Sequence, residues 1–428
     1  MKNFDVLAYQ AVFGADSEKQ AARFEIWQAG IEADIILSSV NDLYMARGSG
    51  KLPNTFTVPA MNLRGMTYDT ARAVFQVAEE LKVGAMICEI ARSEMGYTAQ
   101  SPQEYVSVVT AAALREGWSG PLFIQADHTQ AKAAEMGKIK EGEVAKLEKL
   151  IADAIVAGFY NIDIDMSTLV DLDKPTEAQQ QIPNYEHSIH FAKLIRKLEP
   201  KGITVSLGAE IGHVGGRNST VADFEAFMTG FQAGLPKGLT GISKISVQTG
   251  TDHGGKVLAD GTLADIDVDF SILKNITKVG QSKYQIGGTV QHGASTLPDK
   301  YFNQFVKFEA LEVHLATGFQ NMLLDHPAMP KSLVRKMYEY IDEKHVDERK
   351  STHTDEQFHY KLRKKALGPF KKTLWDLPEK TRAAIKASLT ERFSFFFKQL
   401  SVTNTQTLVK KFVKPVIVKK KLADFSVA

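Results

Sequence analysis

The sequence predicts an α/β protein in which eight parallel strands, each followed by a helix, close into a barrel. Eight short apolar runs, most of them rich in β-branched residues, favour strands. The runs begin about 27 to 43 residues apart, which leaves room for a loop, a helix and a return. Eight such units are the number that closes a (β/α)8 TIM barrel.

The predicted strands are residues 56–61, 85–90, 122–127, 161–166, 204–210, 243–249, 284–290 and 311–317. On pattern alone, 85–90 and 311–317 also fit buried helix segments. An open, doubly wound sheet is the alternative fold, but no GxGxxG motif follows the first strand.

Three stretches between the strands show apolar residues at the three-to-four spacing of a helix. The clearest is 67–84, which starts near Thr67 and Asp69 and closes on Gly84. Residues 142–159 and 183–202 follow the same pattern, and each ends near a glycine. We therefore expect these stretches to be crossover helices of the barrel.

The chain divides into three predicted parts. Residues 1–52 are expected to form a helical N-terminal extension, 53–327 the barrel with its site, and 328–428 a helical C-terminal extension. The charged, glycine-marked segment 131–143 after the third strand is expected to be an exposed excursion.

Composition narrows the class of protein. The 428 residues carry 52 Lys+Arg against 50 Asp+Glu, a formal net charge of +2, which argues against a nucleic-acid partner. The single cysteine, Cys88, excludes an internal disulfide framework and any Cys-rich zinc module. The N-terminus lacks a signal-peptide core, and no apolar run approaches the roughly 20 residues of a membrane helix. We therefore expect a cytoplasmic enzyme without a membrane partner, which assembles as a homo-oligomer.

Histidines mark the ends of three predicted strands. His128, His253 and His292 each follow a strand directly, beside glycine or aspartate. The carboxyl ends of barrel strands meet at the face that carries active sites. Three imidazoles suit a catalytic zinc that keeps an open position for substrate. Gly254 and Gly293 let backbone N–H groups approach an anion there, and phosphate sites are frequent in these loops.

From about residue 55 to 325 the sequence resembles the class II, metal-dependent fructose-bisphosphate aldolases. Each matching motif is weak alone, but five in order at barrel spacing are strong evidence. The motifs are Asp127-His128, Ile164-Asp165-Met166-Ser167, Glu210-Ile211-Gly212 followed by Gly215-Gly216, Gly250-Thr251-Asp252-His253-Gly254, and His292-Gly293-Ala294-Ser295.

The resemblance implies a site, a reaction and a cofactor. One catalytic Zn²⁺ would polarise the oxygens of a ketose phosphate and stabilise an enediolate, with room for a second divalent or monovalent cation. Asp127 would move the proton of the C4 hydroxyl. The implied metal ligands are His128, His253 and His292, with Glu210 and Asp165. The implied substrate and phosphate contacts are Gly254, Gly293, Ser295, Thr317, Asn62 and Arg217.

The sequence departs from the family pattern where the substrate is recognised. The eighth strand carries His314-Leu315-Ala316-Thr317 in place of Asn-x-Asp-Thr, and the fifth-strand loop reads Arg217-Asn218-Ser219-Thr220 where acidic residues are usual. The resemblance therefore implies that the metal site and the C4 acid/base are retained, whereas substrate recognition and a second proton path are rebuilt. Candidates for the rebuilt part are Arg64, Arg92, His213 and Arg217.

Three functions compete. The first is a zinc-dependent aldolase for a ketose mono- or bisphosphate in carbohydrate metabolism such as glycolysis. The second is a ketose C4-epimerase that cleaves, rotates and rejoins the same bond, which fits the rebuilt loop and eighth strand. The third is a non-catalytic sugar-phosphate-binding subunit, which would not need to keep every metal ligand.

Overall fold

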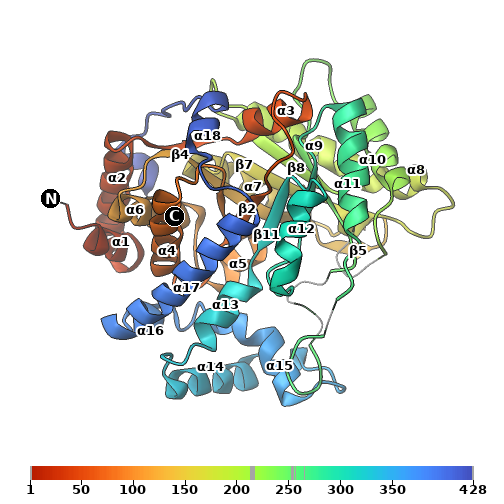
Figure 1. Ribbon diagram of the computed structural model, residues 1–428. Coiled ribbons are helices and arrows are strands. Elements are labelled where there is room, and N and C mark those ends of the chain that lie inside the picture. The colour runs from red at the N-terminus through yellow and green to blue at the C-terminus, as the bar shows by residue number, and fades with distance from the viewer. Residues whose placement is uncertain (1, 213–216, 252–254, 256, 265, 427–428) are drawn as a thin grey trace.

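The computed structural model describes residues 2–212, 217–251, 255, 257–264 and 266–426, and eight of its strands close a parallel barrel (Figure 1). Each barrel strand pairs in parallel with its neighbours, and β11 pairs with β2 to complete the ring. The barrel strands are β2 (Val58–Asn62), β3 (Ile87–Ala91), β4 (Gly120–Gln130), β7 (Asn161–Asp165), β8 (Ser206–Glu210), β9 (Lys244–Val247), β10 (Thr289–Gln291) and β11 (Glu312–Leu315). The predicted (β/α)8 barrel is confirmed, and the two ambiguous runs are strands.

Helices lie outside the ring and connect its strands. They are α4 (Thr67–Glu80), α5 (Arg92–Tyr97), α6 (Pro102–Glu116), α7 (Glu143–Ala157), α8 (Glu177–Gln180), α9 (Ile182–Leu198), α10 (Val221–Gly234), α11 (Phe270–Val279), α12 (Phe302–Lys307) and α13 (Thr317–Leu324). Local sequence sets their ends: Ser101 caps the first turn of α6, and Gly117 ends it at a φ of 73°. The three predicted crossover helices are present as α4, α7 and α9.

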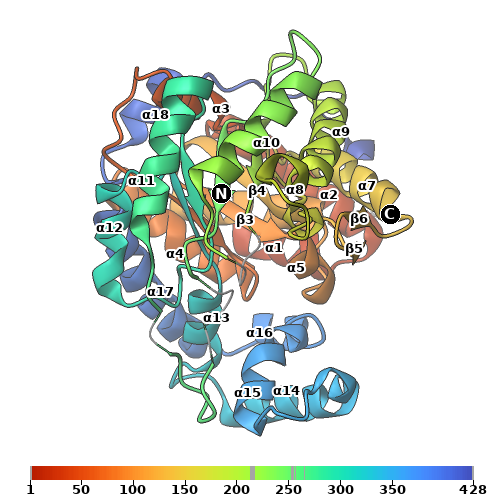
Figure 2. The same ribbon diagram turned by 90° about the vertical axis from the view of Figure 1, so that its right-hand side faces the viewer.

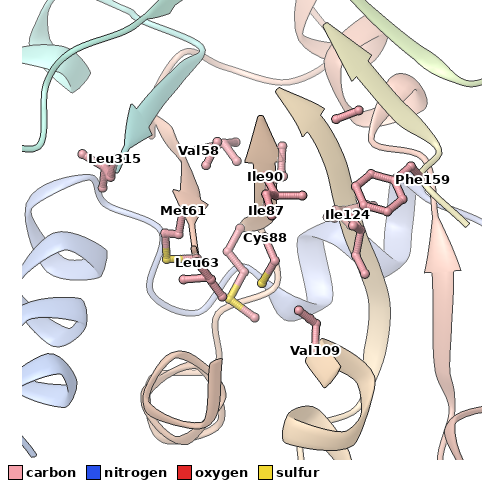
Figure 3. Packing of buried hydrophobic residues seen from close by; sticks show 14 of the residues in the cluster. Val58, Met61, Leu63, Ile87, Cys88, Ile90, Val109, Ile124, Phe159 and Leu315 are labelled. Carbon is pink, nitrogen blue, oxygen red and sulfur yellow. The ribbon is translucent and has the colours of Figure 1, made fainter. Parts of the chain in front are cut away.

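The barrel wall alternates between an apolar outer face and a polar inner face. Along β3, Cys88 and Ile90 belong to the buried apolar core (Figure 3). Glu89, between them, points inward and contacts side chains of other strands. Cys88 is a buried free thiol, in accordance with the absence of a disulfide framework. Because the outer core is apolar and continuous, it holds the ring in the shape that brings the inward side chains together.

The N-terminal part is helical, as predicted, except for one short strand that the sequence analysis did not predict. It contains α1 (Phe4–Phe13), α2 (Asp16–Glu32), β1 (Ile35–Ser38) and α3 (Asn41–Gly48). Asp34 adopts a φ of 59° just after α2, and the β-branched pair that follows pairs in parallel with the first residues of β4. Because Gly120–Phe123 extend beyond the pairing of β4 with β3, they offer this ninth strand a free edge.

The C-terminal part is helical, with α14 (Lys331–Lys344), α15 (Asp355–Leu362), α16 (Lys371–Trp375), α17 (Glu379–Gln399) and α18 (Gln406–Phe412). The apolar side of α17 packs on the barrel helices, with the ring of Phe396 4.7 Å from Phe302 and the ring of Phe393 4.8 Å from Phe319. In both views α14 and α15 lie together at one end of the molecule (Figures 1 and 2). The division of the chain at residues 52 and 327 stays a prediction.

The excursion after the third barrel strand forms a small hairpin, β5 (Ala133–Glu135) and β6 (Lys138–Ile139), whose first strand is fully exposed. Among the described residues, none of the helices has the length and apolar character needed to cross a membrane.

Candidate active site

A cleft of about 1070 Å³ opens at the carboxyl ends of the barrel strands. Its lining combines the ends of β3, β4, β10 and β11 with residues of the C-terminal helices. The sequence-predicted site residues in the lining are Asp127, His128, Gly293, His292, Ser295 and Thr317. Side chains that are up to 190 residues apart in the sequence therefore share one cavity.

A bulge in β4 lets two consecutive residues face this cleft. In a regular strand, Asp127 and His128 would point to opposite faces of the sheet. The register between β4 and β7 shifts between Ala126 and Thr129, and His128 adopts a φ of 41°, in the left-handed region. Such a bulge adds one residue and redirects the side chains beside it. The local strain is consistent with a functional position, since nothing in the packing of an ordinary barrel strand requires it.

His128 lies at the centre of a set of metal-binding atoms. Its Nε2 lies 2.5 Å from Nδ1 of His292, and its Nδ1 lies 3.0 Å from Oδ2 of Asp165 and 3.5 Å from Oε2 of Glu210. Imidazole nitrogens and carboxylate oxygens are the donors that zinc accepts. The predicted ligand His253 and the neighbouring Gly254 lie outside the described residues, as does His213.

The burial of these carboxylates tests whether the site suits a cation. Asp165 is 1% exposed and Glu210 is 4% exposed. Burial, followed by the charge of Asp165, raises the pKa of Glu210 well above its usual range. Two carboxylates held together out of water are stabilised by a positive ion between them and the histidines. The described residues therefore fit a divalent cation.

His314 forms a second layer behind His292. The two imidazole rings stack with centroids 4.1 Å apart at an interplanar angle of 22°. The Nδ1 of His314 lies 3.2 Å from Oδ1 of Asp127 and 3.2 Å from Oε1 of Glu89, and its Nε2 lies 2.6 Å from Oε1 of Glu312. The sequence identified His314 as a departure from the family pattern but assigned it no role.

The buried Lys244 also contacts Glu312, which it shares with His314. The Nζ of Lys244 lies 2.5 Å from Oε1 of Glu312, 2.9 Å from Oδ1 of Asp163 and 2.7 Å from Oε1 of Gln125. Burial lowers the pKa of Lys244, but the two carboxylates outweigh burial and raise it. Sequence reasoning missed this group, and the only available signal was the occurrence of charged residues inside runs predicted to be buried strands.

The cleft lining also contains the hydroxyls of Ser295 and Thr317 and the guanidinium of Arg64. Thr317 begins α13, and its Oγ1 accepts a hydrogen bond of 3.1 Å from Nη2 of Arg64. The Oγ of Ser295 accepts from the backbone N–H of Gly318 at 3.0 Å, where a Cβ on Gly318 would lie 2.5 Å from the Ser295 carbonyl oxygen. Gly293 adopts a φ of 70°. A helix N-terminus, two hydroxyls and an arginine form a suitable environment for an anion.

The model of the family "Fructose-bisphosphate aldolase class-II" matches residues 52–373, most of the chain. The chain belongs to the class II fructose-bisphosphate aldolase family. The match covers all eight barrel strands and every predicted site residue.

Solved structures agree with this family at the level of the fold. The fructose-bisphosphate aldolase of Campylobacter jejuni is 16% identical, with a TM-score of 0.51 over 85% of this chain and 94% of its own. The YdjI aldolase of Escherichia coli K12 is 12% identical, with a TM-score of 0.51 over 87% of this chain and 100% of its own. At such identities the likeness establishes the barrel and not the reaction.

Two predicted substrate residues lie apart from the described lining of the aldolase-family cleft. Asn62, at the end of β2, is 1% exposed and its Nδ2 donates to Glu94. Arg217 is half-exposed and forms an ion pair with Asp223 at the start of α10. Of the other candidates, Arg64 and Arg92 do line the cleft, and Arg92 donates to the Gln130 carbonyl at 2.7 Å. The substrate roles of Asn62 and Arg217 stay predictions.

Proposed function

We propose that the protein is a metal-dependent aldolase that cleaves or forms a carbon–carbon bond in a ketose phosphate. The observation that carries this proposal is the convergence of His128, His292 and Asp127 on one cleft of a class II aldolase barrel. The other conclusions below depend on that convergence.

The proposed metal is zinc, held by His128 and His292 with Glu210, Asp165 and the sequence-predicted ligand His253. A bound divalent ion supplies Lewis acidity to the carbonyl and hydroxyl oxygens of the substrate. Support comes from the buried carboxylates around His128, because a cation offsets the cost of their burial.

Asp127 is the proposed acid/base. It lines the cleft while 5% of its surface is exposed, so a substrate hydroxyl can reach it with little competing water. In the cleavage direction its carboxylate takes the proton of the C4 hydroxyl, which becomes the aldehyde carbonyl as the C3–C4 bond breaks. The electron pair of that bond stays with the ketose half, and the proton returns to the C4 oxygen when the bond forms again.

The phosphate of the substrate is proposed to lie against Ser295, Thr317 and the backbone near Gly293. The N-terminus of α13 starts at Thr317, where backbone N–H groups and the helix dipole favour an anion. A phosphate fixed there would hold the reacting carbons at a constant place relative to Asp127.

A C4-epimerase is the second candidate, favoured by one observation. His314 stands in the eighth strand where aldolases carry asparagine, and it contacts both His292 and Asp127. A rebuilt surface beside the reacting carbon is consistent with an enzyme that retains the cleaved aldehyde, lets it rotate and rejoins it on the other face.

One experiment separates these functions. Purified, zinc-loaded protein is incubated with a panel of ketose mono- and bisphosphates, and the products are followed by NMR. An aldolase releases triose fragments that coupling enzymes can trap, whereas an epimerase yields the C4-inverted ketose without free triose. If zinc-loaded protein forms neither product from any member of the panel, the catalytic proposal fails and the binding-subunit reading gains support.

A further inference from the structure

His314 is a buried histidine surrounded by carboxylates. It is 4% exposed and lies between carboxylates of four strands: Glu89 on β3, Asp127 on β4, Asp163 on β7 and Glu312 on its own strand β11. It also lines the cleft. Both ring nitrogens face carboxylate oxygens, and these contacts restrict the orientation of the imidazole ring.

One of these contacts reaches the proposed acid/base. The Nδ1 of His314 lies 3.2 Å from Oδ1 of Asp127, within hydrogen-bonding distance. By contrast, the nearest His128 nitrogen lies 3.8 Å from the same oxygen, which is too long for a hydrogen bond. Among the described contacts, His314 is therefore the histidine placed to orient the carboxylate of Asp127.

The other ring nitrogen of His314, Nε2, contacts the carboxylate of Glu312. Its Nε2 lies 2.6 Å from Oε1 of Glu312, and Lys244 holds the same oxygen at 2.5 Å. The other oxygen of Glu312 accepts from the hydroxyl of Tyr44. Glu312 and Lys244 are 0% exposed, so water does not compete for these contacts. Carboxylate–imidazole–carboxylate arrangements of this kind fix a reactive group within a narrow range of positions.

We propose that His314 is a positioning residue, which orients Asp127 for proton transfer at the C4 hydroxyl and is itself anchored by Glu312. This inference rests on the proposed function, in which Asp127 is the acid/base. It gives the eighth-strand substitution of His314 for asparagine a role in the proton step.

A double-mutant cycle tests the inference through turnover. We compare His314→Ala and Asp127→Ala, alone and combined, in the cleavage of the best ketose phosphate found. If His314 acts through Asp127, His314→Ala lowers kcat about 10- to 100-fold with little change in KM, and costs less than about threefold once Asp127 is alanine. Equal losses in both backgrounds would show that His314 acts independently and overturn the proposal.

Three further variants separate positioning from folding and from metal binding. His314→Asn keeps an amide N–H at the position of Nδ1, toward Asp127, and should recover part of the kcat lost in His314→Ala. Glu312→Gln should lower kcat without loss of zinc. His326, half-buried beside Ser388 and outside the cleft lining, provides the control His326→Ala, which removes an imidazole and should leave kcat unchanged. Loss of zinc from His314→Asn would make His314 a metal ligand and would also overturn the proposal.

A measurement without turnover distinguishes this inference from the aldolase assignment. In protein with ¹⁵N-labelled histidine, the low-field imidazole N–H proton that disappears in His314→Asn should shift in Asp127→Asn. If no ketose phosphate is turned over but this shift occurs, the proposed function fails while the contact stands. If the signal does not respond to Asp127→Asn, the contact itself is refuted.

Discussion

The roles of Asp127 and Asp165 can be separated by removing each carboxylate in turn. The two residues lie on neighbouring strands and flank His128, and both are at least 95% buried. The Oδ2 of Asp165 lies 3.0 Å from Nδ1 of His128, within hydrogen-bonding distance. The Oδ1 of Asp127 lies 3.8 Å from the other ring nitrogen, Nε2. On this geometry we propose that Asp165 belongs to the metal site and that Asp127 transfers the proton, although Asp127 also lies near His128 and His292.

This assignment gives two different expected losses. Asp127→Ala should keep zinc and substrate binding but lower kcat about 10²- to 10⁴-fold, the usual contribution of a general acid/base, equivalent to about 3–5 kcal/mol of the barrier. Asp165→Ala should weaken zinc about 10- to 100-fold, because it removes a ligand or the group that orients one. Its activity should recover as zinc is added.

The assay is single-substrate cleavage measured across a zinc titration, with bound metal determined on the same samples. Each variant serves as the control for the other, because both remove one buried carboxylate beside His128. If excess zinc returns Asp127→Ala to near the wild-type rate, Asp127 is a metal-site residue and the acid/base reasoning is wrong.

Two further predictions concern the proposed anion site and the buried Lys244. The double change of Ser295 and Thr317 to alanine should raise KM at least tenfold and more than it lowers kcat, since each hydrogen bond to a charged oxygen contributes about 1.5–3 kcal/mol; equal efficiency on a ketose and its phosphate would argue against this anion site. Lys244→Met should lower the free energy of unfolding in urea by about 3–5 kcal/mol, because it leaves two buried carboxylates without their cation. Lys283→Met, which removes an ion pair between the exposed Lys283 and the partly exposed Glu225, should change stability little. A similar loss of stability in both variants would contradict the reasoning.

The barrel could be predicted because its strands can be recognised from local sequence alone. Eight β-branched runs at regular intervals admit few other topologies, and glycines such as Gly117 and Gly158 end the helices between them. The strand β1 was missed because Ile35–Ser38 follow a long helical pattern without a gap. Its strand conformation depends on a free edge of β4, which the sequence does not reveal.

Only those residues of the candidate site that belong to a recognisable sequence motif could be predicted. Asp127, His128 and His292 follow strand ends in a recognisable order, and they line one cleft in the structure. The network of His314 and Lys244 could not be predicted, since it depends on which inward side chains meet across the ring. The bulge at His128, which lets Asp127 and His128 both face the cleft, lies within a strand longer than the predicted 122–127, and the sequence does not reveal it.

The central claim, that a divalent metal at His128 and His292 enables the reaction, is tested most directly by metal analysis of active and EDTA-treated protein. We predict about one tightly bound zinc per chain, loss of ketose phosphate cleavage on its removal and recovery on its return. His128→Ala and His292→Ala should lose the ion while the circular dichroism of the barrel is unchanged. Full activity in metal-free, EDTA-treated protein would contradict the account.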